Sequence, residues 1–171
     1  MIRVKVVSKI LYYISNILAL GYLATTLYSV ICLLTQQGIA PYGEGKYIHI
    51  MYPFTNEPFL NIDNNAPYVV FSFLLPLSLY SLFFWAASRV FKVFYQPRLF
   101  TSQNITHLRR FYLLNMLVPV SCAILSGFFV QLESVVWVLV IVHLFLGIFA
   151  YFLAAIFRQG LQLQKEQDLF I

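Results

Sequence analysis

Four long apolar runs, each without a Lys, Arg, Asp or Glu, dominate the pattern of the chain. They cover residues 10–34, 68–88, 111–132 and 135–157. As helices they would be about 31 to 37 Å long, enough to cross a hydrocarbon core of about 30 Å. Because backbone polar groups in lipid must be paired within their own segment, each run is predicted to be helical. The pattern therefore predicts an all-α integral membrane protein, a single domain over residues 1–171 with four transmembrane helices.

The third and fourth runs are almost continuous, since Glu133 is the one charge between residues 111 and 157. A single helix over this stretch would be about 70 Å long, more than twice the membrane thickness. The chain must reverse at the polar segment 131–134, which predicts a tight helical hairpin. Close packing of the two helices is expected along a stripe of small residues, Gly147, Ala150 and Ala154. Proline kinks are expected inside spans two and three, at Pro76 and Pro119.

The connection 35–67 is the longest on its side of the membrane. It has turn signals at 42–45 and 63–65, with β-forming residues at 46–52 between them, so a short strand or β-hairpin is predicted. This segment would be either a lid or external ligand surface, or a packed cap over the helix ends. The second interpretation is favoured, because most loops are only connections.

Composition excludes a soluble or a disordered protein. Hydrophobic residues make up 61% of the chain and charged residues 10%, against roughly 45–50% and 25% in soluble proteins. Ten of the eleven Lys and Arg residues precede the first run or lie in the connection 89–110 or the tail 158–171, whereas Lys46 lies on the other side. By the positive-inside rule, both termini are predicted to be cytoplasmic, and the net charge of +5 is an orientation signal.

The cytoplasmic connection 89–110 contains a helix start. Thr101 is predicted to be the N-cap, with Phe100 and Ile105 forming a hydrophobic staple. The helix would continue into the third span and place Arg109 at the level of the lipid headgroups. The five basic residues of this connection favour anionic lipid headgroups as partners, although topology determination alone also explains them.

Few residues in the spans carry chemistry. His143 is the only strongly ionisable side chain inside a span, which makes it a candidate intramembrane polar site. The alternative, which is favoured, is a neutral histidine bonded to a hydroxyl such as that of Ser121 or Ser126. The two cysteines, Cys32 and Cys122, lie in apolar stretches and suggest no disulfide. No nucleophile motif, phosphate-binding loop or metal-ligand spacing occurs, so the sequence predicts no catalytic residue, cofactor or metal, and no enzyme.

The segments predicted to face the cytoplasm carry a recognisable pattern: Phe100-Thr101, Asn104 and Leu108-Arg109, and then Phe157, Gly160, Leu163 and Glu166-Gln167-Asp168-Leu169. This pattern resembles the YoaS-like family of small four-span bacterial membrane proteins, a domain family of unknown function. Phe170 stands where that family usually has Thr. The resemblance implies the bacterial cytoplasmic (inner) membrane as the location. It also implies a small helix-turn-helix regulator encoded nearby, which would contact DNA in place of this chain.

Two functions follow as hypotheses. In the first, the chain is a membrane sensor or modulator whose cytoplasmic face binds the regulator. The candidate contact residues are Phe100, Thr101, Asn104, Arg109, Gly160, Glu166, Asp168 and Leu169. In the second, it handles a small molecule or lipid, as a transporter subunit or immunity factor, in a cavity beside His143 and the kink at Pro76. The apolar end 169–171 would fold back onto the protein or contact a partner. Homo-oligomerisation is left open.

Overall fold

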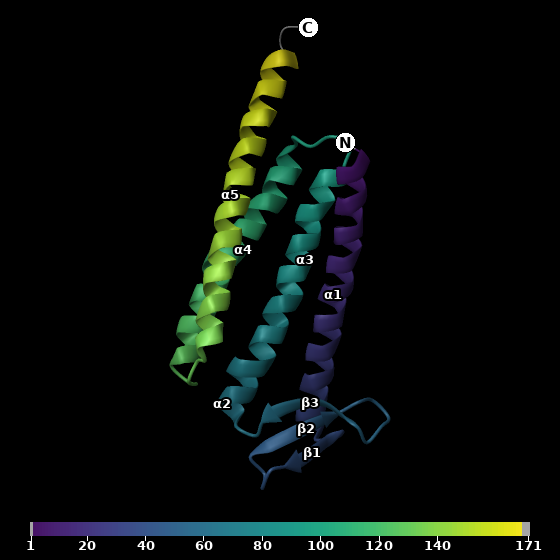
Figure 1. Ribbon diagram of the computed structural model, residues 1–171, viewed down its shortest axis with the longest axis vertical. Coiled ribbons are helices and arrows are strands. Elements are labelled where there is room, and N and C mark those ends of the chain that lie inside the picture. Colours follow the sequence, from purple (N-terminus) through teal and green to yellow (C-terminus); the bar gives the residue numbers. More distant parts are fainter. Residues whose placement is uncertain (1, 169–171) are drawn as a thin grey trace.

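The protein is built from long helices and one small sheet. The computed structural model describes residues 2–168, and 75% of the chain is helical, which confirms the predicted all-α class. The elements in order are α1 (Ile2–Thr35), β1 (Ile39–Tyr42), β2 (Tyr47–Met51), β3 (Pro58–Asp63), α2 (Ala66–Tyr68), η1 (Val69–Leu74), α3 (Leu75–Tyr95), α4 (Ser102–Gly127) and α5 (Ser134–Asp168) (Figure 1).

Within the described residues, four helical segments are long and apolar enough to cross a membrane, as predicted: Arg3–Thr35, Ala66–Tyr95, Ser102–Gly127 and Ser134–Asp168. Their bounds differ from those of the apolar runs. Helices α3 and α4 extend into the predicted connection 89–110 and leave only residues 96–101 between them. Helix α4 ends at Gly127, although the apolar run continues to residue 132. It ends early because the N–H groups of Phe128 and Phe129 bond to the last carbonyls of the helix and begin the reversal.

The helices form two pairs, α1 with α3 and α4 with α5, which are joined where α4 packs against α3 (Figure 1). The face of α1 that packs on α3 is made of small side chains, and Ser81 Oγ on α3 donates to the carbonyl oxygen of Ala19 at 2.9 Å. Small residues let two helix backbones approach closely. The buried small side chains of α1 are Ser8, Ser15, Ala19, Thr26, Ser29 and Cys32.

The segment 35–67 forms a three-stranded antiparallel sheet in the order β1-β2-β3, so the predicted hairpin is present and is extended by a third strand. Its apolar face is buried with Cys32 through Ile48, Ile50 and Ile62. Tyr28 Oη on α1 also donates to the carbonyl oxygen of Met51 at 2.7 Å. The sheet is therefore a packed cap on the end of α1 and on η1, the interpretation that the sequence favoured.

The molecule has two distinct ends (Figure 1). At the first, called the basic end, lie the start of α1, the connection 96–101 and the last turns of α5. At the second, called the sheet end, lie the sheet and the α4–α5 turn, residues 128–133. Helix α5 continues past the other helices at the basic end, so residues 158–168 extend away from α1, α3 and α4 (Figure 1). The predicted apolar tip, 169–171, lies outside the described residues.

Candidate functional site: a cavity between α3, α4 and α5

The motif residues at the basic end have structural roles. Thr101 is the N-cap of α4, as predicted, since its hydroxyl accepts a hydrogen bond from the Asn104 N–H at 3.2 Å. The Asn104 side chain is fully buried and donates to the carbonyl oxygens of Arg98 and Leu99, at 3.1 and 2.8 Å. Gly160 leaves room for the Phe100 ring, because a Cβ there would lie 2.6 Å from that ring. These contacts hold the 96–101 connection in shape and dock it on α5.

The candidate contact residues for a regulator therefore fall into two groups. Asn104 has no exposed surface, and Phe100 and Gly160 are half-buried against each other. The exposed candidates are Arg109, Glu166 and Asp168, with Thr101 half-buried, whereas Leu169 lies outside the described residues. Binding of a regulator to the exposed group stays a prediction, which retention of the regulator by the purified protein would test.

A cavity of about 430 Å³ opens between η1 and α3 on one side and α4 and α5 on the other. Pro76 and His143 both line it, so a cavity is present where the sequence suggested one. Its volume falls in the range of about 300–1,000 Å³ that small-molecule sites occupy. Cys122, a free thiol, is also in its wall, whereas the free thiol of Cys32 is buried under the sheet. In the described part of the chain, no three His, Cys, Asp or Glu side chains gather as a metal site.

His143 is held by a side chain that the sequence interpretation overlooked. Its Nδ1 lies 2.7 Å from Oδ1 of Asn115, which is fully buried on α4. Because the Asn115 amide nitrogen donates to the carbonyl oxygen of Phe111 at 2.8 Å, its oxygen is the acceptor and His143 Nδ1 carries the proton. The expected hydroxyl partners, Ser121 and Ser126, do not make this bond. The sequence does carry a signal for this partner, because Asn115 is a polar amide inside the apolar run 111–132.

The cavity lies where the helical hydrogen bonding is interrupted. Segment η1 is a π-helix, and the N–H of Leu75 bonds to the carbonyl oxygen of Val70, five residues back. The next residue is Pro76, which has no N–H to donate and so disturbs the α-helical pattern before it. Pro119 on α4 likewise deprives the carbonyl of Asn115 of its helical donor. Both prolines line the cavity, so the predicted kink positions coincide with its walls.

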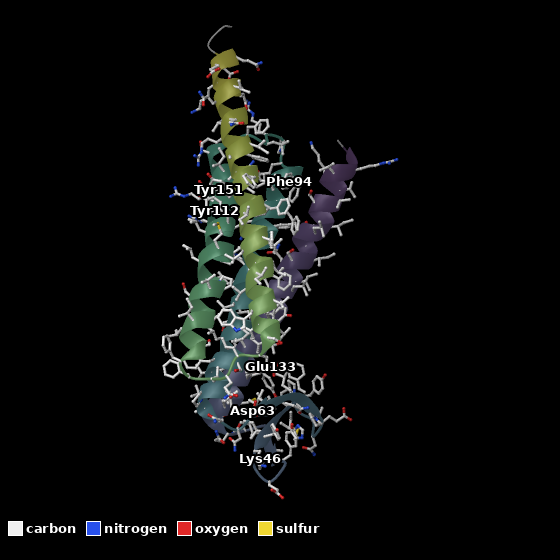
Figure 2. All side chains as sticks on the ribbon, turned by 60° about the vertical axis from the view of Figure 1, so that its left-hand side comes forward. Lys46, Asp63, Phe94, Tyr112, Glu133 and Tyr151 are labelled. Carbon is white, nitrogen blue, oxygen red and sulfur yellow. The ribbon has the colours of Figure 1, made fainter. Side chains whose placement is uncertain are left out.

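Aromatic side chains pack together at the sheet end of the cavity. The rings of Phe71 on η1 and Phe129 in the α4–α5 turn stack with centroids 4.6 Å apart. The N–H of Gln131 also donates to Tyr68 Oη at 3.4 Å. At the same end the cavity is lined by two carboxylates, Asp63 and Glu133 (Figure 2). At its other end the His143 ring packs edge-on against Phe83, with centroids 5.0 Å apart.

The fold has the features of a multi-pass helical membrane protein: four helices that are long and apolar enough to cross a membrane, with a β-sheet cap at one end. No protein-family model, curated protein or solved structure matches the chain. The likeness to the YoaS-like family therefore rests on the motif residues alone and stays a prediction.

Proposed function

We propose that this chain is a non-enzymatic protein of the bacterial cytoplasmic membrane that binds an amphipathic small molecule or lipid between α3, α4 and α5. The observation that carries the proposal is the cavity itself, whose wall is mainly apolar and includes the hydrogen-bonded His143. Ligand sites in proteins combine an apolar concave wall with a few fixed polar groups. Of the two functions that the sequence suggested, this geometry supports small-molecule or lipid handling.

A sensing role is compatible with the same site. Helix α5 lines the cavity with His143 and continues without a break to residue 168 at the basic end. On the way, Phe157 packs against Phe94 and Phe100, with ring centroids 5.9 and 5.3 Å apart. A ligand that shifts α5 would therefore also change the contacts of the 96–101 connection. This path supports the first hypothesis, in which the basic end holds a regulator.

The proposal includes an orientation. The basic end carries the Lys and Arg excess, so it would face the cytoplasm, and the sheet end would face outward. Reporter fusions test this: a reporter at residue 55 should be active only outside the cytoplasm, and reporters at residues 95 and 171 only inside it. A cytoplasmic signal from residue 55 would contradict the proposed orientation.

Ligand binding is expected to protect the thiol of Cys122. In membrane vesicles containing the Cys32→Ala variant, Cys122 is the one remaining thiol and reports on the cavity. Dodecanol, dodecylamine and dodecanoic acid serve as probes, and N-ethylmaleimide labels the thiol. A probe at ten times its dissociation constant leaves about one site in eleven open, so at least one probe should slow labelling about tenfold.

Two variants on α4 separate cavity binding from general effects on the membrane. Val118→Trp places a large ring in the cavity wall and should abolish protection by every probe. Leu117→Trp puts the same ring on the exposed face of the helix and should leave protection intact. If no probe slows the labelling, or if protection persists in Val118→Trp, the proposed function is wrong.

A further inference from the structure

The charged residues that line the cavity are all acidic. They are Asp63 at the end of β3 and Glu133 just before α5, two positions that only the folded chain brings together. Among residues 2–168, no Lys or Arg lines the cavity, although the chain has eleven of them. The sheet end of the cavity therefore repels anionic headgroups and attracts cations. Both side chains are exposed, so these effects act through solvent and weaken as salt is added.

The aromatic wall of the cavity favours the same sign of charge. Tyr68, Phe71, Tyr80 and Phe83 line it along one helical stretch that runs from α2 through η1 into α3. The face of an aromatic ring carries partial negative charge and attracts ammonium groups within about 6 Å. A cation in the cavity would therefore share it with rings whose faces attract positive charge.

His143 adds a hydrogen-bond acceptor rather than a positive charge. Its Nδ1–H is engaged by Asn115, so in the neutral ring Nε2 keeps a free lone pair. The side chains of His143, Asp63 and Glu133 therefore all offer hydrogen-bond acceptors to a ligand. Such a set is matched by a group that donates hydrogen bonds, such as an alkylammonium.

The distribution of these groups sets the orientation of a ligand. Glu133 and His143 are ten positions apart on adjoining turn and helix, which corresponds to about 15 Å along the axis. Between them the wall is apolar and includes Leu79, Val118 and Leu139. A headgroup at the carboxylates would leave room for an apolar body along this wall.

We propose that the cavity takes a hydrophobic cation, with its ammonium group at Asp63 and Glu133 and its apolar body between α3, α4 and α5. The inference rests on the proposed function, because it specifies the ligand class of the same cavity. It excludes fatty acids and anionic phospholipid headgroups as preferred occupants.

Charged thiol reagents test the inference without a known ligand. In Cys32→Ala vesicles, the rate at Cys122 is measured with a cationic trimethylammonium-ethyl and an anionic sulfonatoethyl methanethiosulfonate. The ratio of the two rates is then divided by the same ratio for a free thiol in solution. Attraction by two carboxylates should make this normalised preference for the cation about tenfold.

Matched neutral variants identify the carboxylates responsible. In the double variant Asp63→Asn with Glu133→Gln, the normalised preference should fall to about one, since the attracting charges are gone. The double variant Glu44→Gln with Glu57→Gln makes the same charge change at exposed positions between the strands, which do not line the cavity. Its preference should stay near the original value, because salt screens charges beyond about 8 to 10 Å. Unchanged labelling by neutral N-ethylmaleimide would show that both variants are folded.

The dodecyl probes then separate this inference from the proposed function. Dodecylamine, which is charged at neutral pH, should protect Cys122 at about a tenth of the concentration that dodecanol needs, and the Asp63 and Glu133 variant should remove that advantage. Equal protection by dodecanol, or better protection by dodecanoic acid, would overturn the cationic ligand and leave the proposed cavity function standing. Failure of all three probes would overturn both.

Discussion

Replacing Gly147 with leucine is expected to lower the free energy of unfolding by about 3 kcal/mol, the upper part of the range for overpacking a close contact. Gly147 lies on α5 where it meets α4. A Cβ built there would be 2.5 Å from Cγ of Met116 and 3.3 Å from both the Met116 nitrogen and the Tyr112 carbonyl oxygen. The Met116 side chain is able to rotate away, but the two backbone atoms move only with the helix. The α4–α5 pair would therefore have to separate beside Asn115 and His143.

The measurement is equilibrium unfolding in mixed micelles at increasing dodecyl sulfate, with helicity as the signal. Gly21→Leu is the matched control, because a Cβ at Gly21 on α1 meets no other atom within 4 Å. This control should change the free energy of unfolding little, or increase it slightly through higher helix propensity. If the two leucine variants behaved alike, the close approach of α4 and α5 at Gly147 would be contradicted.

The second large effect is expected at the bond between Asn115 and His143. Asn115→Leu should cost about 1–3 kcal/mol, because it leaves the His143 Nδ1–H without a partner inside the helix bundle. His143→Leu should cost a similar amount by orphaning the Asn115 oxygen. The double leucine variant removes both polar groups and should cost less than the sum of the two single variants. The unfolding measurement used for Gly147 supplies all four corners of this cycle.

Asn16→Leu controls for the loss of a polar side chain in an apolar helix. The Asn16 amide donates only to the Tyr12 carbonyl of its own helix, at 2.7 Å, so no partner on another helix loses its bond. The expected change in unfolding free energy is small. Strict additivity of Asn115→Leu and His143→Leu would show that the two side chains do not interact, and it would also weaken the case for His143 as a fixed polar group in the cavity.

The features predicted correctly depend on short-range chemistry. The N-cap at Thr101 needs only its own hydroxyl and the N–H three residues on. The α4–α5 hairpin follows from the length of an apolar stretch and a single polar interruption near Glu133. Strand β2 was predicted because its β-forming residues lie between two turn signals, whereas β3 was not predicted. The strand begins at Pro58, contains Asn61 and is followed by Asn64 and Asn65, all residues that disfavour strands, and it pairs with β2 along its length.

The features that were missed depend on contacts between distant segments. Asn115 and His143 are 28 positions apart and meet only because α4 and α5 pack closely at Gly147. Asp63 and Glu133 share a cavity because the sheet folds over η1 while Phe71 and Phe129 hold the α4–α5 turn beside it. The sequence suggested Phe100 and Gly160 as contact residues for a regulator, but in the structure the two residues pack against each other.

The sequence by itself determined the class of protein, the four apolar helices and the uneven distribution of charge along the chain, because helix length and local polarity depend on neighbouring residues. Only the tertiary structure decided which helices pair, which polar groups meet and which sign of charge lines the cavity. Side-chain hydrogen bonds reach about 3 Å and screened Coulomb interactions about 10 Å, and the folded backbone sets which residues come within those distances.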